Sequence, residues 1–398
     1  AAAAHSLGAD YRLRTSVYGT PGPGESTVLR VVGRGDPSLT TAQLDALAQQ
    51  LAQAGVSQVS RLILDDSYFP GFATNPTWEW EDAQYAYAAP VNSLILNRNA
   101  IALQIAPTQV GSSLSVVWPQ PLPAGPLPVV NDAITVAAGA PALPLALWRR
   151  GDSPSVRLTG QLAEGSGAQT LNLAVLNPTE QFAAAMEQAL QRQSIPVGQT
   201  AITQTPSPLA GQELAALESP SVGELMLRAN RDSDNLYAEA LFKTLGVTAG
   251  GPISEASQAG GRAVINSLTE LGVEASALRL ADGSGLSRHN LVSPIALVDT
   301  LQVMTTHPQG RAFRASLAVA GQSGTLSNRL RGTALEGRLQ GKSGALTGNV
   351  SLAGYVQPPD YEPLVFSLVI NHANQPASQL RARIDELMQL VAQLQTGC

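Results

Sequence analysis

The stretch Gly341-Lys342-Ser343-Gly344 stands shortly before an alternating run of residues at 350–356. Lys243 and Lys342 are the only lysines of the sequence, so a chain that otherwise uses arginine has a lysine here. The alternation predicts a strand, with the glycine-bracketed lysine in a turn before it. An ammonium beside a hydroxyl and two glycines could hold a carboxylate, but a surface lysine in a hairpin turn explains the same residues.

The composition is that of an ordered globular protein. The 398 residues are 44% hydrophobic and 14% charged, and the chain is long enough for two or three domains. A formal net charge of −6 without a basic stripe argues against nucleic-acid binding. No apolar run reaches the roughly 18 residues of a membrane-spanning helix. The single cysteine, Cys398, provides no disulfide framework and no cysteine-based metal site.

The first half of the chain reads as mixed and then β-rich. Strands are predicted at 11–18, 28–32 and 59–65, and a helix at 41–54. Between about 92 and 160, short β-like runs alternate with proline-dense segments such as 119–123. This texture predicts a small, irregular, mostly β module.

The second half reads as helices followed by strands. Ser221 and Glu224 form a capping box that opens a helix. Further helices are predicted at 236–245, ended by Gly246, at 254–271, and from Pro294 onward. Strands at 350–356 and 364–370 precede a terminal amphipathic helix at 378–394. The apolar residues that share a face of this helix are Leu380, Ile384, Leu387 and Val391. This order predicts an α+β domain.

A short polar connection at 230–235 holds Ser233 and Asn235 between two predicted helices. Such residues commonly serve only as caps and turn formers. Their order is nevertheless informative. A Ser-x-Asn element followed later by a Lys-Ser-Gly element such as Lys342-Ser343-Gly344 belongs to a known set of active-site motifs. Completed by Ser-x-x-Lys, that set is the one of serine β-lactamases and penicillin-binding proteins.

Over nearly its whole length the chain resembles the low-molecular-mass class C penicillin-binding proteins. These are D-alanyl-D-alanine carboxypeptidases and endopeptidases that act on peptidoglycan peptides. The most specific signature is Ala281-Asp282-Gly283-Ser284-Gly285-Leu286-Ser287-Arg288-His289-Asn290-Leu291. Other stretches that carry the resemblance are Leu7-Gly8-Ala9-Asp10-Tyr11-Arg12, Gly35-Asp36-Pro37-Ser38-Leu39, Ser233-Asp234-Asn235 and Leu352-Ala353-Gly354-Tyr355.

The resemblance implies an α+β fold with a penicillin-binding, β-lactamase-like transpeptidase domain, in which helices accompany an antiparallel sheet. We expect residues 1–26 and 201–398 to form this domain, with its N-terminal part incomplete. We expect 27–200 to be a large β-rich insert of one or two small domains, which includes the module at about 92–160.

The resemblance also implies roles for single residues. Ser233 would relay a proton toward the leaving amine, and Asn235 would hydrogen-bond the substrate's peptide amide. Lys342 would supply positive charge for the terminal carboxylate of D-Ala, to which a hydroxyl on the same strand would donate. N–H groups of that strand would contribute to an oxyanion hole. Substrate-binding residues on the strand would be Ser343, where the family more often has Thr, Gly344 and Ala345.

An aromatic and acidic cluster extends from Trp78 to Pro90. It could simply anchor two domains against one another. The resemblance implies that it lines one side of the substrate cleft, with Trp78 and Tyr85 flanking the stem peptide. Glu81 or Asp82 would then pair with the free amino group of a diamino acid such as diaminopimelate.

The sequence departs from the family at the nucleophile. Neither lysine follows a serine at the required spacing, because Ala240 precedes Lys243 and Leu339 precedes Lys342. The family's Ser-x-x-Lys helix ends in a Leu-Gly like the one at 7–8, so we expect the chain to be a fragment whose serine precedes Ala1. The alternative is a catalytically inactive peptidoglycan-binding homologue or scaffold. These residues alone are not expected to form an acyl-enzyme.

Other chemistries find little support. The four histidines have no paired spacing, which argues against zinc, and we expect no metal or cofactor. No G-x-S-x-G elbow occurs at 321–324, because Thr325 follows. A β-lactamase is disfavoured because a large insert suits a cell-wall enzyme.

The expected partners are peptidoglycan peptides and β-lactam antibiotics, and the expected location is periplasmic or extracytoplasmic. Carboxypeptidase or endopeptidase preference, the third stem-peptide residue, oligomeric state and membrane association stay open.

Overall fold

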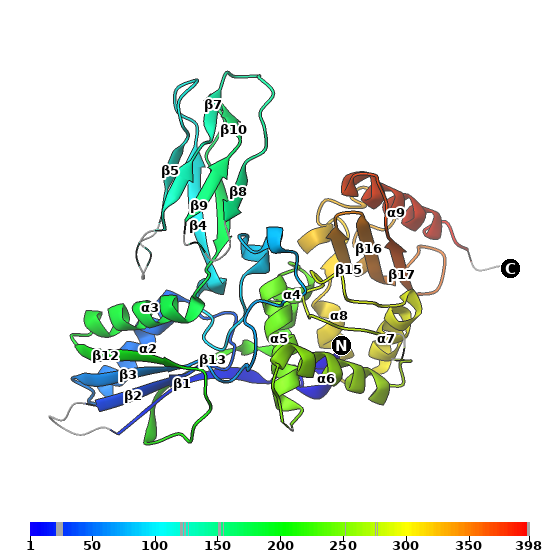
Figure 1. Cartoon of the computed structure of the whole chain (residues 1–398). Helices are drawn as coiled ribbons and strands as arrows, with labels where there is room; N and C mark the ends of the chain where they lie inside the picture. Colours follow the sequence, from blue (N-terminus) through cyan, green and yellow to red (C-terminus); the bar gives the residue numbers. More distant parts are fainter. Residues whose placement is uncertain are drawn as a thin grey trace. The chain divides into compact units, whose positions relative to one another are not determined.

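The computed structural model describes residues 1–20, 27–119, 122, 125, 127–149, 153, 155–250, 252–274, 276 and 278–395. Cys398 and part of the proline-dense run at 119–123 lie outside these residues. The chain divides into two compact units (Figure 1). The first consists of Ala1–Arg12 and Pro220–Cys398, and the second of Leu13–Ser219. The expected insert at 27–200 therefore lies wholly within the second unit.

The first unit is built on an antiparallel sheet of order β14-β15-β16-β17. The strands predicted at 350–356 and 364–370 are confirmed. The turn predicted around Lys342 is wrong, because Lys342 lies inside β15 and pairs with Ala353. The chain turns later, at Gly348, whose φ of +76° suits glycine. The strands are β14 (Ala318–Val319), β15 (Leu339–Leu346), β16 (Asn349–Val356) and β17 (Leu364–Ile370).

Helix α9 (Ala377–Val391) packs on this sheet. Its buried residues recur every four positions at Leu380, Ile384 and Met388, and they form one core with strand residues such as Leu352. The predicted face is wrong at Leu387, which is 47% exposed. Leu387 stands one position away from the i, i+4 line that Met388 continues toward the sheet.

The other helices of this unit pack mainly on one another, and α7 packs on β16 and β17. Predicted helix positions are confirmed, but α5 does not end at Gly246 as predicted. A Cβ at Gly246 would lie 2.4 Å from the backbone nitrogen of Gly260, so this glycine permits the close packing of α5 on α6. The helices are α1 (Ala2–Ser6), α4 (Val222–Asn230), α5 (Asn235–Thr248), α6 (Ala256–Glu270), α7 (Pro294–Thr306) and α8 (Gly310–Ala315), with the 3₁₀ turn η4 (Gly324–Leu326).

The second unit contains a mixed sheet of order β12-β3-β2-β1-β13. Strands β1 and β2 are antiparallel, whereas β3 is parallel to both β2 and β12. The apolar faces of α2 and α3 form a core with this sheet. The elements are β1 (Arg12–Gly19), β2 (Thr27–Val32), α2 (Thr41–Gln53), β3 (Val59–Asp65), α3 (Pro178–Arg192), β12 (Val197–Thr203) and β13 (Gln212–Ser221).

A β-rich module lies between β3 and α3 in the sequence (Figure 1). It contains small sheets of order β11-β4-β5, β10-β7 and β6-β9-β8, which share an apolar core. Its last strand lies beyond the predicted end at 160. The strands are β4 (Ala100–Ala106), β5 (Ser115–Val117), β6 (Val129–Asn131), β7 (Ile134–Val136), β8 (Ala146–Arg149), β9 (Val156–Thr159), β10 (Gln161–Ala163) and β11 (Gln169–Ala174). None of the helices in the described ranges has the length and apolarity needed to cross a membrane.

Gly354 offers a test of how closely β15 and β16 must approach. A Cβ at this position would lie 2.1 Å from the backbone oxygen of Gln340 and 2.6 Å from the Cα of Gly341. We therefore expect Gly354→Ala to lower the free energy of unfolding by about 1–3 kcal/mol, since backbone atoms must move. Thermal denaturation measures the change. The matched control is Gly223→Ala in α4, where a Cβ would make only ordinary contacts; equal stability of the two variants would contradict the expectation.

Candidate active site

Ser233 lies in the short connection between α4 and α5. Ser221 and Glu224 cap the start of α4 reciprocally, as predicted, and Asp234 caps α5 by accepting from the Tyr237 N–H at 3.4 Å. The φ of Ser233 is +59°, which costs a non-glycine residue about 1–2 kcal/mol. The flanking helices impose this conformation, and such strain is common at functional sites. Asn235, the other predicted residue of this segment, is the first residue of α5.

Lys342 connects the sheet to the Ser233 segment. Its Nζ donates to Ser233 Oγ at 2.7 Å and to the backbone oxygen of Ser343 at 2.6 Å. Burial lowers the pKa of Lys342 to about 8. The ammonium is therefore charged at neutral pH but can release its proton more readily than an exposed lysine. The structure thus brings together Ser233, predicted as a proton relay, and Lys342, predicted to supply positive charge for the substrate's carboxylate.

The part of β15 that carries the predicted substrate-binding residues has an open edge. In the described part of the chain, β14 pairs with β15 only at Gln340 and Gly341. The following residues, including Ser343, Gly344 and the exposed Ala345, pair only with β16 on their other side. Unpaired N–H and C=O groups of this kind can receive an extended peptide as an added strand.

Thr325 is a residue of the site that the sequence reading missed. Ser343 Oγ donates to Thr325 Oγ1 at 2.8 Å. In the sequence, Thr325 served only to exclude a nucleophile elbow at 321–324. No motif spacing links a threonine in η4 to β15, so only the folded structure shows their proximity.

The 281–291 loop is organised around the carboxylate of Asp282. That carboxylate accepts from the N–H groups of Gly285 at 3.0 Å and Ser287 at 3.1 Å, and from Asn290 Nδ2 at 2.5 Å. It also accepts from the hydroxyl of Ser284 at 2.6 Å. A loop of glycines and serines obtains a defined shape in this way, because one buried anion satisfies several donors at once.

Helix α5 holds this loop through a buried glutamate. Glu239 Oε2 accepts from the Gly283 N–H at 2.6 Å, and Oε1 accepts from Ser257 Oγ at 3.2 Å. Burial raises the pKa of Glu239 to about 7, although the charge of the buried Lys243 opposes this rise. Lys243 is therefore a structural lysine of the core, whereas Lys342 belongs to the site.

The aromatic and acidic cluster belongs to the second unit. Tyr85 stacks on Tyr87 with ring centroids 5.4 Å apart, and its hydroxyl accepts from the Leu147 N–H at 3.4 Å. The Tyr87 hydroxyl donates to Asp82 Oδ1 at 2.6 Å. Glu81 is exposed in the 3₁₀ turn η1 (Trp80–Asp82). The half-buried Trp78 lies two residues before the start of this turn. The predicted contacts of Trp78, Glu81, Asp82 and Tyr85 with a substrate stay predictions.

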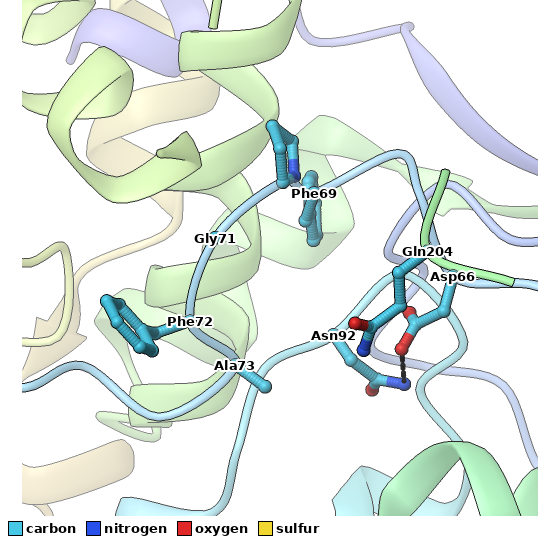
Figure 2. Close-up of a pocket in the computed structure, with 8 residues that line it drawn as sticks. Asp66, Phe69, Gly71, Phe72, Ala73, Asn92 and Gln204 are labelled. Carbon is cyan, nitrogen blue, oxygen red and sulfur yellow. Dashed lines mark hydrogen bonds between the residues drawn. The ribbon is translucent and has the colours of Figure 1, made fainter. Parts of the chain in front are cut away.

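A pocket of about 540 Å³ in the second unit was not predicted. Figure 2 shows the side chains of Asp66, Asn92 and Gln204 on one side of it and Phe72 on the other. The Asp66 carboxylate is held within the scaffold, because it accepts from Thr179 Oγ1 at 2.6 Å, the Ser93 N–H at 2.8 Å and Asn92 at 3.4 Å. These bonds give Asp66 a structural role.

Comparison with known proteins places the chain in a family. Residues 1–393 match the D-Ala-D-Ala carboxypeptidase 3 (S13) family. The D-alanyl-D-alanine carboxypeptidase of Actinomadura sp. (strain R39) is 35% identical over 395 residues, which are 95% of this chain and 72% of that protein. Penicillin-sensitive carboxypeptidase A of Dictyostelium discoideum is 27% identical over 416 residues, with 97% of this chain and 78% of that protein covered.

Solved structures agree with this placement. The crystal structure of penicillin binding protein 4 (dacB) from Haemophilus influenzae matches with a TM-score of 0.86 and 25% identity, covering 99% of this chain and 89% of that one. The predicted fold class, a penicillin-binding α+β fold with β-rich additional parts, is confirmed. The chain belongs to the D-Ala-D-Ala carboxypeptidase 3 (S13) family.

The lowered pKa of Lys342 predicts a pH-dependent stability. The unfolded chain releases this proton near pH 10.5 and the folded protein near pH 8, so the folded state binds fewer protons between these values. Stability contributed by Lys342 should therefore rise between about pH 8 and 10.5. We expect the stability difference between the native protein and Lys342→Met to shift in favour of the native protein over this range. Urea denaturation at several pH values measures it, and a pH-independent difference would refute the assignment.

Proposed function

We propose that the native protein is a serine D-Ala-D-Ala carboxypeptidase or endopeptidase that hydrolyses peptidoglycan stem peptides through an acyl-enzyme. The observation that carries the proposal is the contact of Lys342 Nζ with Ser233 Oγ at 2.7 Å, beside the open edge of β15. Membership of the S13 family and likeness to a penicillin-binding protein support it. Because its polymeric substrate lies outside the cytoplasmic membrane, we propose a periplasmic or extracytoplasmic location.

The site residues suit the two halves of this reaction. A serine oxygen would attack the peptide carbonyl as its proton passes to the lysine of the Ser-x-x-Lys element. An ester forms as the C–N bond breaks, and the leaving amine needs one proton. Ser233 can pass its proton to that amine and receive another from Lys342, whose lowered pKa favours the transfer. Water would then hydrolyse the ester and release the shortened peptide.

The open edge of β15 would orient the peptide. An extended substrate can pair with backbone groups beyond Lys342, and N–H groups of the strand would stabilise the oxyanion. Gly344 places no side chain on this part of the strand, where a Cβ would lie 2.6 Å from Ser351 Oγ on β16. We further propose that Asn235 binds the substrate's amide and that Ser343, Gly344 and Ala345 contact its C-terminal residue.

The second unit would contribute specificity for the third stem-peptide residue. We propose that Trp78 and Tyr85 flank the peptide and that Glu81 or Asp82 pairs with the amino group of a diamino acid. The exposure of the Glu81 side chain supports this, because an exposed carboxylate can meet a cationic amine with little desolvation cost. Asp82 already accepts from the Tyr87 hydroxyl and so holds a fixed orientation.

These 398 residues contain no Ser-x-x-Lys motif. Three residues before each lysine, where the attacking serine would stand, the sequence has Ala240 and Leu339. We therefore propose that the native protein contains the Ser-x-x-Lys element and that its supporting groups lie among these residues. A catalytically inactive peptidoglycan-binding homologue is the alternative. Both readings use the same Lys342 and Ser233 geometry, and covalent chemistry distinguishes them.

The test is to label the native, full-length protein with a fluorescent penicillin. We expect a long-lived covalent adduct, and we expect Lys342→Ala to reduce the acylation rate by about 100-fold or more, because the variant lacks both the charge and the bond to Ser233. Arg383→Ala is the control, because Arg383 is an exposed cation on α9. Retained binding of peptidoglycan without an adduct would favour the inactive homologue. Rapid antibiotic turnover would indicate a β-lactamase.

A further inference from the structure

Thr325 presents a hydroxyl beside the predicted carboxylate-binding residue. It lies exposed in η4, and its Oγ1 accepts from Ser343 Oγ at 2.8 Å. The two hydroxyls belong to segments that are 18 positions apart in the sequence. The two hydroxyl oxygens are 2.8 Å apart, which is close enough for both hydroxyls to donate to one carboxylate group.

The fold holds Thr325 firmly in this place. Its N–H donates to the backbone oxygen of Arg231 at 3.1 Å, two residues before Ser233. Gly324 has a φ of +58°, and a Cβ there would lie 2.2 Å from the same Arg231 oxygen. Only glycine permits this approach, so the turn is tied to the Ser233 segment on one side and to β15 on the other.

The ammonium of Lys342 is already engaged. It donates to Ser233 Oγ and to the backbone oxygen of Ser343, which uses two of its three N–H groups. Its charge attracts an anion, but short hydrogen bonds that fix the anion's orientation must come largely from other donors. On the exposed side of the site, the hydroxyls of Ser343 and Thr325 are suitably placed, whereas the neighbouring Ala345 has none.

We propose that Thr325 is a substrate-binding residue that supplies the second hydroxyl for the terminal carboxylate of the substrate. On binding, the hydrogen bond between Ser343 and Thr325 is exchanged for two bonds to the carboxylate, one from each hydroxyl. Lys342 then contributes long-range charge, and the hydroxyl pair provides orientation. This inference rests on the proposed function, since it takes a peptide with a free C-terminal carboxylate as the ligand.

The experiment measures the affinity of the native protein for a peptide that ends in D-Ala-D-Ala but has a ketomethylene group in place of the scissile amide, which cannot be hydrolysed, and for the same peptide with a C-terminal amide. Calorimetry gives both dissociation constants. Thr325→Val keeps the side-chain shape but lacks the hydroxyl, and we expect it to weaken binding of the carboxylate peptide by about 10- to 100-fold. Binding of the amide peptide should change less than about 2-fold. Thr325→Ser should restore the preference for the carboxylate.

Thr305→Val is the matched control, because the hydroxyl of Thr305 bonds only to the backbone of its own helix, at Gln302, among the contacts described. It should leave both affinities unchanged. Equal losses for the two peptides in Thr325→Val would show a merely structural role and overturn the proposal, as would no loss or no carboxylate preference in the native protein. Failure of penicillin labelling with the Thr325 effect intact would refute the proposed function and leave the carboxylate subsite standing.

Discussion

The hydrogen bond between Lys342 Nζ and Ser233 Oγ is the interaction on which the site depends. It joins the β15 strand to the connection between α4 and α5, across 109 positions of sequence. Both partners are held at a cost: Ser233 has a left-handed backbone, and Lys342 is partly removed from water. Such a pair persists only where the surrounding helices and sheet leave it no other arrangement, and here they also tune the acidity of the lysine.

Close backbone approaches provide that rigidity. Gly354 lets β15 and β16 pair without a side chain between them, and Gly246 lets α5 lie against α6. Gly324 likewise lets the turn that carries Thr325 approach the backbone oxygen of Arg231. A side chain at any of these positions would meet backbone atoms, so the site is positioned by main-chain packing as much as by its polar side chains.

Two buried carboxylates complete the support. Asp282 gathers the donors of its own loop, and Glu239 attaches that loop to α5 through Gly283. Arg288 of the same loop donates to the backbone oxygen of Thr347, at the turn between β15 and β16. The 281–291 loop, α5 and the β15–β16 hairpin are therefore linked by hydrogen bonds, which explains why a segment rich in glycine and serine has a defined shape.

The sequence by itself determined the α+β class, the strands and most helices of the first unit, because periodicity, caps and the order of elements are local signals. That Ser233 and Lys342 belong to one site was only implied by the resemblance that their motifs carry. The sequence misplaced Lys342 in a turn, ended α5 at Gly246 and put Leu387 on the buried face. Those errors arise where packing overrides local preference. Only the tertiary structure could decide the contact between Thr325 and Ser343, the open edge of β15 and the lowered pKa of Lys342. Each of these depends on which segments that are distant in the sequence lie side by side in the fold.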